Sequence, residues 1–278
     1  MTRKLIFLDI DGTILIPGEQ IRQTVVDGLK KARANGHMVF ICTGRAHSSL
    51  PDELDRIELD GQICSAGSDI WIGGENRWSC SLDPKLIEKA CRILEEMDAV
   101  CLLEGFKETF MSRKGTEILT EEVRPGDNSE LARWKSYFRR RPNVRSLSEW
   151  DPKQSPIPKV TFIVWRREQM DEVRRKLGED FYVAFFQSST KGVYNGELIS
   201  RTENKGTAIR RTAQLLGEDV RNTVAFGDSM NDYQMIEEAA CGVVMENGDE
   251  ALKAIADRVC ESVREDGVIR ELARMGVV

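Results

Sequence analysis

Two aspartates stand one residue apart, directly after a short apolar run near the start of the chain. The segment reads KLIFLDIDGTIL, in which Leu5 to Leu8 are typical of a buried strand and Asp9 and Asp11 follow it. Two carboxylates at the end of a buried strand repel each other and raise each other's pKa values. Carboxylates also serve as nucleophiles and as acid/base groups. The segment therefore predicts chemistry at the end of this strand.

Other polar residues occupy comparable places in the chain. Each follows an apolar run that reads as a strand or opens a predicted helix. In a parallel α/β sheet, ligands bind beyond the carboxyl ends of the strands, so we expect these groups to share one rim with the two aspartates. They are Thr43, Gly44, Lys205, Asp228, Asn231 and Asp232.

This set of groups suits a metal ion and a phosphate. Three carboxylates at one rim, those of Asp9, Asp11 and Asp228, repel one another unless a hard divalent cation lies between them. Mg²⁺ takes oxygen ligands and commonly bridges to a phosphate. Phosphoryl transfer needs charge neutralisation and alignment, and a lysine and a threonine hydroxyl beside the cation would bind the phosphoryl group. The sequence therefore predicts Mg²⁺-dependent phosphoryl transfer with an aspartate nucleophile and an aspartate acid/base.

The elements that must position these groups alternate between strands and helices. Residues 4–8 read as a strand, 21–36 as a helix ending at a glycine, and 38–42 as a second strand. Strand, helix and strand with short connections form a βαβ unit and hence a parallel sheet. The same alternation returns from residue 204 to residue 262. We expect an α/β fold with a doubly wound, Rossmann-like parallel sheet.

The middle of the chain has a different character. Asp83-Pro84 opens a helix over 83–97, and the proline-rich stretch 150–159 must be a loop. A strand, a helix and a strand then follow over 159–165, 167–178 and 181–189. This pattern predicts an inserted α/β module with an antiparallel-leaning sheet. The expected domains are a core of residues 1–83 and 194–278 and a cap of residues 84–193.

Composition narrows the class of protein. The chain has 278 residues with 41% hydrophobic and 31% charged residues, and no apolar run approaches the roughly 20 residues of a membrane span. The N-terminus lacks the features of a secretory signal. Seven scattered cysteines without a CxxC pair favour thiols in a reducing cytoplasm. The net charge of −6 argues against nucleic-acid binding. No feature of the sequence indicates an oligomeric state.

The order DIDGT, TG, Lys and GDSMND resembles the haloacid dehalogenase (HAD) superfamily of phosphohydrolases. The resemblance implies that Asp9 is phosphorylated and that Asp11 protonates the leaving oxygen and later activates water. It also implies that Asp11 binds the metal through its backbone carbonyl, and that Asp228 completes the protein ligands to Mg²⁺.

The resemblance further implies how the phosphate is held. Thr43, Gly44 and Lys205 would bind it, with the backbone N–H of Ile10. Asn231 would reach the phosphate, and Asp232 would orient Lys205 or a metal-bound water. Arg45, which follows the TG motif, could touch substrate or pair with a local carboxylate.

The long insertion between Thr43 and Lys205 resembles the Cof-type branch of the superfamily, which carries a large α/β cap there. Two segments depart from that branch: Asn247 is followed by Gly248, and SAGSDIWIGGE stands where the branch has Asn-Gly-Ala. The second segment borders the expected site, so substrate choice could differ while the phosphate chemistry should not.

The predicted activity is hydrolysis of a small phosphomonoester, such as a sugar phosphate or a related metabolite. One alternative is a phosphosugar mutase or other phosphotransferase on the same scaffold, which would release little free phosphate. The other is a non-enzymatic signalling module phosphorylated on Asp9. Such a module would give no reason for Asp11 or for the large cap.

Overall fold

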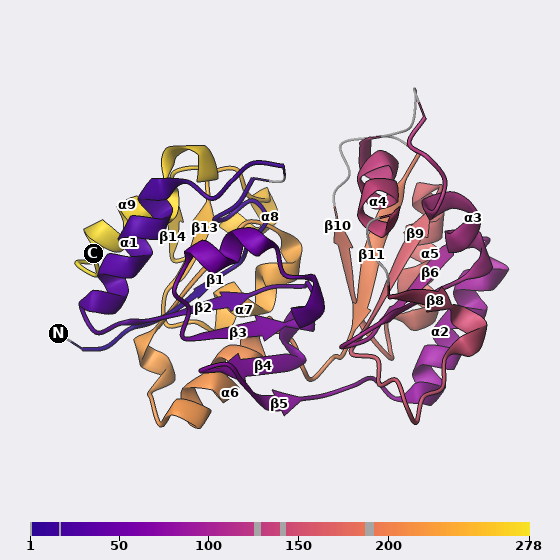
Figure 1. The fold of residues 1–278 in the computed structure, drawn as a ribbon, viewed down its shortest axis with the longest axis horizontal. Coiled ribbons are helices and arrows are strands. Elements are labelled where there is room, and N and C mark those ends of the chain that lie inside the picture. Colours follow the sequence, from indigo (N-terminus) through magenta and orange to yellow (C-terminus); the bar gives the residue numbers. More distant parts are fainter. Residues whose placement is uncertain (1, 17, 125–128, 140–142, 187–191) are drawn as a thin grey trace. The chain divides into compact units, whose positions relative to one another are not determined.

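The computed structural model describes residues 2–16, 18–124, 129–139, 143–186 and 192–278. It divides the chain into two compact units (Figure 1). Unit 1 comprises Met1–Ser79 and Thr202–Val278, and unit 2 comprises Cys80–Arg201.

Unit 1 is built on an eight-stranded sheet, counted over its described residues, in the order β14-β13-β12-β1-β2-β3-β4-β5. From β14 to β3 neighbouring strands run parallel, and β4 and β5 add an antiparallel edge. The expected α/β fold with a parallel sheet is confirmed. The strands are β1 (Leu5–Leu8), β2 (Met38–Cys42), β3 (Gly61–Cys64), β4 (Asp69–Ile72), β5 (Glu75–Ser79), β12 (Thr223–Gly227), β13 (Gly242–Met245) and β14 (Arg258–Cys260).

Helices cover both faces of this sheet (Figure 1). Strand β1 lies inside the sheet, so its alternate side chains enter two cores: Ile6 and Leu8 pack with α1 and α9, whereas Leu5 and Phe7 pack with α6 and α7. A strand buried on both faces explains the uninterrupted apolar run before Asp9. The helices are α1 (Gln23–Ala34), α6 (Lys205–Leu216), α7 (Tyr233–Glu238), α8 (Glu250–Lys253) and α9 (Gly267–Arg274).

Unit 2 contains a second sheet, which has six strands in its described part in the order β10-β11-β9-β6-β7-β8. All neighbouring strands run antiparallel except β7 and β8, which confirms the predicted antiparallel-leaning sheet. Helices α2 and α5 cover one face, and α3 and α4 cover the other. The elements are α2 (Pro84–Glu96), β6 (Val100–Glu104), β7 (Thr109–Met111), α3 (Arg113–Leu119), α4 (Ser129–Arg139), β8 (Val144–Ser146), β9 (Lys159–Val164), α5 (Arg167–Leu177), β10 (Tyr182–Phe186) and β11 (Tyr194–Ile199).

The two predicted domain boundaries differ from the observed units. Residues 194–201 were expected in the core, but β11 pairs with β9 and β10 and so belongs to unit 2. Residues 80–83 also belong to unit 2, where Leu82 N–H donates to the Ile157 carbonyl. The predicted strand over 181–189 is observed as β10 up to Phe186, and residues 187–189 lie outside the described residues.

None of the helices in the described ranges is both long and apolar enough to span a membrane.

Candidate active site

Asp9 lies at the carboxyl end of β1, in the middle of the sheet of unit 1. Its backbone N–H donates to the Phe226 carbonyl and so extends the pairing with β12. The side chain is buried, and its Oδ1 accepts a hydrogen bond from Lys205 Nζ at 2.6 Å. Burial raises the pKa of Asp9 to about 7, although the Lys205 ammonium opposes this shift. A buried carboxylate with a bonded cation at the end of a central strand is well placed to act as a nucleophile.

Lys205 is the first residue of α6, whose N-cap Asn204 accepts hydrogen bonds from the Gly206 and Thr207 N–H groups. The ammonium of Lys205 is buried between two carboxylates, at 2.6 Å from Asp9 and 2.5 Å from Asp232. Burial disfavours its charged form, but Asp232 and Asp9 hold the pKa of Lys205 well above its usual value. The lysine therefore remains a cation at the site.

Asp232 has both carboxylate oxygens engaged. Oδ1 accepts from Lys205 Nζ, and Oδ2 accepts from the backbone N–H groups of Asp228 and Ser229 at 3.0 and 3.2 Å. One side chain thus fixes the lysine and the turn that carries Asp228. Of the two roles expected for Asp232, this geometry fits the orientation of Lys205.

Asp228 follows β12 and faces the turn after β1. Its Oδ1 is buried and accepts no hydrogen bond. Burial, reinforced by the Asp9 and Asp232 carboxylates, raises the pKa of Asp228 to about 9. Oxygens of Asp9, Asp228 and Asp232 all lie within 4.8 Å of one another. Crowded acidic oxygens, one of them unpartnered, fit a hard divalent cation.

Because Lys205 and the two backbone groups occupy Asp232, the carboxylates available for such a cation are those of Asp9 and Asp228. The Asp11 carboxylate is outside this group. A contribution of Asp11 to a metal would come from its backbone carbonyl, as the resemblance implies.

The turn after Asp9 requires a glycine at position 12. Gly12 has φ +86°, and a Cβ atom there would lie 2.2 Å from Asp228 Oδ2. The carbonyl of Gly12 accepts from Asn247 Nδ2 at 2.9 Å, and the Asn247 Oδ1 accepts from the Val263 N–H. Asn247 therefore ties the aspartate turn to the C-terminal segment, a link that the sequence did not reveal.

Asp11 is held by Arg45 in a bidentate ion pair. Arg45 Nε lies 2.8 Å from Asp11 Oδ2, and Arg45 Nη2 lies 2.7 Å from Asp11 Oδ1. Of the two roles considered for Arg45, the structure shows the pairing with a local carboxylate. Its planar fork fixes the orientation of the Asp11 carboxylate, which a lysine could not do in the same way.

Thr43 and Gly44 form the loop after β2. The Thr43 N–H donates to the Ile63 carbonyl, and the Thr43 Oγ1 accepts from the Arg45 N–H, which leaves the hydroxyl proton to donate. The segment that departs from the Cof-type branch lies against this loop: Ala66 N–H donates to the Thr43 carbonyl, and Ser65 N–H donates to the Arg45 carbonyl. This departure therefore touches the loop expected to bind phosphate.

Two predicted phosphate-binding residues occupy different environments. The Ile10 side chain is fully buried in the core of unit 1, so only its backbone could serve the site. Asn231 is partly buried, and its Oδ1 accepts from the Ser229 hydroxyl at 2.6 Å, which leaves the amide nitrogen to donate. Both positions are compatible with the roles expected of them.

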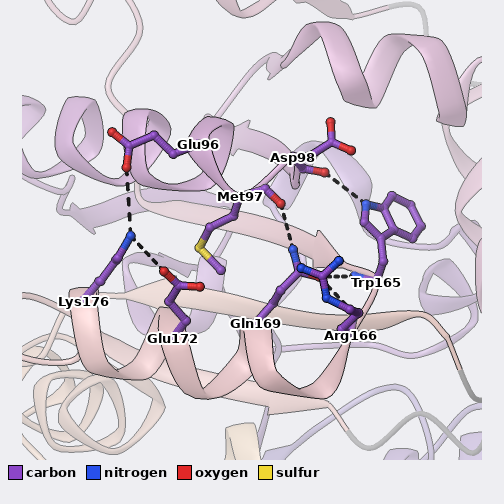
Figure 2. A pocket seen from close by; sticks show the side chains of 8 residues that line it. All are labelled: Glu96, Met97, Asp98, Trp165, Arg166, Gln169, Glu172 and Lys176. Carbon is purple, nitrogen blue, oxygen red and sulfur yellow. Dashed lines mark hydrogen bonds and ion pairs between the residues drawn. The ribbon is translucent and has the colours of Figure 1, made fainter.

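Unit 2 has a hollow of about 320 Å³ whose polar side chains bond to neighbouring elements of the fold (Figure 2). Gln169 Nε2 donates to the Met97 carbonyl at 2.7 Å, and Trp165 Nε1 donates to the Asp98 carbonyl at 3.0 Å, so the polar groups join α5 and β9 to the end of α2. The lining residues are Glu96, Met97, Asp98, Trp165, Arg166, Gln169, Glu172 and Lys176.

Comparisons with known proteins agree with the motifs. The sequence model of the haloacid dehalogenase-like hydrolase family matches residues 6–272. A Streptococcus pyogenes protein named as a phosphatase is 28% identical over 282 residues, covering 99% of this chain and 98% of its own. Pyridoxal phosphate phosphatase YbhA of Escherichia coli is 25% identical, covering 96% and 97%.

A solved structure gives the same result for the fold. A haloacid dehalogenase-like hydrolase from B. subtilis is 25% identical, covers 98% of this chain and 99% of its own, and has a TM-score of 0.82. The chain therefore belongs to the haloacid dehalogenase-like hydrolase family and is a phosphatase of the Cof-type branch of that family.

Proposed function

We propose that the chain hydrolyses a small phosphomonoester through an aspartyl-phosphate on Asp9. The observation that carries the proposal is the Lys205 ammonium, buried between Asp9 and Asp232 beside the crowded Asp228 carboxylate. This arrangement keeps Asp9 next to a fixed positive charge, where a phosphate dianion could bind despite the surrounding carboxylates.

The first step is attack of an Asp9 carboxylate oxygen on phosphorus. The bond between phosphorus and the ester oxygen breaks, and the leaving oxygen takes a proton from Asp11, which must enter this step as the carboxylic acid. Arg45 pairs with both oxygens of the Asp11 carboxylate and would fix the direction of this side chain before it takes up that proton. In the second step water attacks the same phosphorus, gives a proton to Asp11, and releases phosphate and the free Asp9 carboxylate.

The phosphate is held by donors from four segments of unit 1. Thr43 offers its hydroxyl and Gly44 a backbone N–H, while Lys205 offers its ammonium. The backbone N–H of Ile10 and the amide of Asn231 complete the expected set. All of these residues belong to unit 1, so this unit would supply the donors to the phosphate.

We propose Mg²⁺ as the cofactor, held by the carboxylates of Asp9 and Asp228 and by the backbone carbonyl of Asp11. When bound, the ion would neutralise charge on the carboxylates and on the phosphate. The unpartnered Oδ1 of Asp228 and the raised pKa values of Asp9 and Asp228 support this assignment, because a bound cation would stabilise both carboxylates in their charged form.

We propose that unit 2 is the cap, which selects the leaving group and excludes water during the reaction. The substrate class is small phosphorylated metabolites, such as sugar phosphates, phosphoglycerate derivatives or cofactor phosphates. The E. coli relative is named for pyridoxal phosphate, which belongs to this class. The proposal includes a cytoplasmic location, which an odd number of scattered cysteines without a CxxC pair favours.

The test is release of inorganic phosphate from a panel of phosphorylated metabolites, with Mg²⁺ and with a chelator. We expect turnover only with Mg²⁺ and none in Asp9→Asn, whose folding is checked by circular dichroism. Interconversion of phosphosugar isomers without phosphate release would indicate a mutase instead. Full activity of Asp9→Asn would exclude this residue as the nucleophile.

A further inference from the structure

Two cysteines of unit 2 lie in contact. Cys91 is on α2 and Cys101 is on β6, and their Sγ atoms are 3.8 Å apart. Cys101 is buried, whereas Cys91 is partly exposed. The bond length of a disulfide is about 2.05 Å, so the sulfurs must approach each other by about 1.75 Å to join. Neither thiol belongs to the proposed catalytic machinery, all of which is in unit 1.

The pair is reachable from solvent. Both cysteines line a cavity of about 1080 Å³ in unit 2, together with side chains such as Glu95, Ser112 and Lys114. A cavity of this size admits a small reagent to the exposed side of Cys91. An incoming reagent can therefore react first with the partly exposed Cys91, and the buried Cys101 can then react with Cys91.

The two thiols also differ in chemistry. The hydrogen bond between the two thiols lowers the pKa of Cys91, and the same hydrogen bond, with burial, raises the pKa of Cys101 well above its usual value. A partly exposed cysteine with a lowered pKa is the more nucleophilic member of such a pair. Four other cysteines differ from Cys91, because burial disfavours their thiolates and raises their pKa values. They are Cys42, Cys64, Cys241 and Cys260.

We propose that Cys91 and Cys101 form a reversible disulfide that links α2 to β6, with a small-molecule disulfide as the oxidant. The Cys91 thiolate attacks one sulfur of the oxidant, which gives a mixed disulfide on Cys91 and releases one small thiol. The Cys101 thiol loses its proton to solvent, its sulfur attacks Cys91 Sγ, and the second small thiol leaves. Two protein thiols are oxidised by two electrons, and one small disulfide is reduced to two thiols.

The test uses the full chain treated with oxidised glutathione, followed by alkylation of the remaining thiols and tryptic mass mapping. Trypsin places Cys91 on residues 90–92 and Cys101 on residues 93–107, so the link joins two separate peptides. We expect this linked pair in the wild type and its disappearance after dithiothreitol. The number of thiols that react with the alkylating reagent should fall from seven to five.

Three variants sharpen the result. Cys241→Ser, which changes a partly exposed cysteine elsewhere, should still form the link. Cys101→Ser should stop at the mixed disulfide on Cys91, and Cys91→Ser should leave Cys101 unmodified. Circular dichroism and urea unfolding of each variant serve as the check that it is folded. Two results would overturn the proposal: glutathione that stays on Cys91 of the wild type without a link, or both thiols unmodified while other cysteines react.

Discussion

Replacement of Asp228 by asparagine should inactivate the enzyme and yet stabilise its metal-free form. Asn keeps the shape of the side chain and cannot ionise, whereas Asp228 is an ionisable group buried beside the Asp9 and Asp232 carboxylates. Burial, then Asp9, raises the pKa of Asp228 from 3.8 to about 9. The folded protein therefore binds a proton here that the unfolded chain has already lost over most of this pH range.

The sign and size of the effect follow from this difference. A raised pKa stabilises the folded state fully below about pH 4, and this contribution is lost as pH rises toward about 9. One pKa unit corresponds to about 1.36 kcal/mol, so between about pH 4 and pH 8 this group would lower the free energy of unfolding of the wild type by on the order of 5–6 kcal/mol. Structural relaxation reduces this penalty, and we expect Asp228→Asn to gain about 2–4 kcal/mol over wild type at that pH.

The assay is urea unfolding of both proteins in a chelator and in Mg²⁺, at about pH 5 and about pH 8. We expect the advantage of Asp228→Asn in chelator to grow with pH, and Mg²⁺ to stabilise the wild type but hardly the variant. Asp52→Asn removes an exposed carboxylate and is the matched control, for which no such pH-dependent gain is expected. A variant less stable than wild type in chelator at the higher pH, or equal stabilisation of both by Mg²⁺, would refute the reasoning.

Three further substitutions test the surroundings of the site. Gly12→Ala should lower both stability and Mg²⁺ affinity, because its Cβ would lie 2.2 Å from Asp228 Oδ2. The control Gly36→Ala has a similar φ of +90° but meets nothing within 4 Å and should lose only about 1–2 kcal/mol in urea unfolding. Ala66→Gly should stabilise the fold by about 0.5–1 kcal/mol because Ala66 has φ +57°, whereas Ala46→Gly, at φ −68°, should destabilise it. Arg45→Met should lower kcat by about 10–100-fold through loss of the fixed Asp11 orientation, with Arg45→Lys restoring only part of it; wild-type kcat in Arg45→Met would contradict this role.

The positions of the site residues could be predicted because each follows an apolar strand or opens a helix. The run before Asp9 is buried on both faces of the sheet, and the helix that begins at Lys205 has a clear N-cap in Asn204. Sequence spacing and the rule for ligand sites in parallel sheets were sufficient to predict that Asp9, Lys205, Asp228 and Asp232 converge. The cluster of Asp9, Lys205, Asp228 and Asp232 confirms that convergence, while their catalytic roles stay predictions.

What could not be predicted depends on contacts between distant segments. Strand β11 has the sequence YNGELI, whose Asn195, Gly196 and Glu197 resemble a loop. In the fold Glu197 accepts from Lys159 Nζ at 2.6 Å on the neighbouring strand, so a buried ion pair compensates its charge. Lys159 is 38 residues away in the chain, so the sequence of β11 alone does not indicate that this segment belongs to unit 2.

The pairing of Arg45 with Asp11 was undecided for the same reason. The sequence showed only that an arginine follows the Thr43-Gly44 loop, and the direction of its side chain depends on how β1 and β2 lie side by side. The positive φ values of Ser65 and Ala66 were also not apparent from the sequence, because neither residue type favours them.

The central claim is that an oxygen of Asp9 becomes bonded to phosphorus. The most direct measurement is rapid quenching during turnover, followed by borohydride reduction, which converts an aspartyl-phosphate to homoserine, and mass mapping of the peptide that contains Asp9. The account predicts homoserine at position 9 only when substrate and Mg²⁺ are both present. Phosphate release with Asp9 never modified, or homoserine at position 11 or 228 instead, would contradict it.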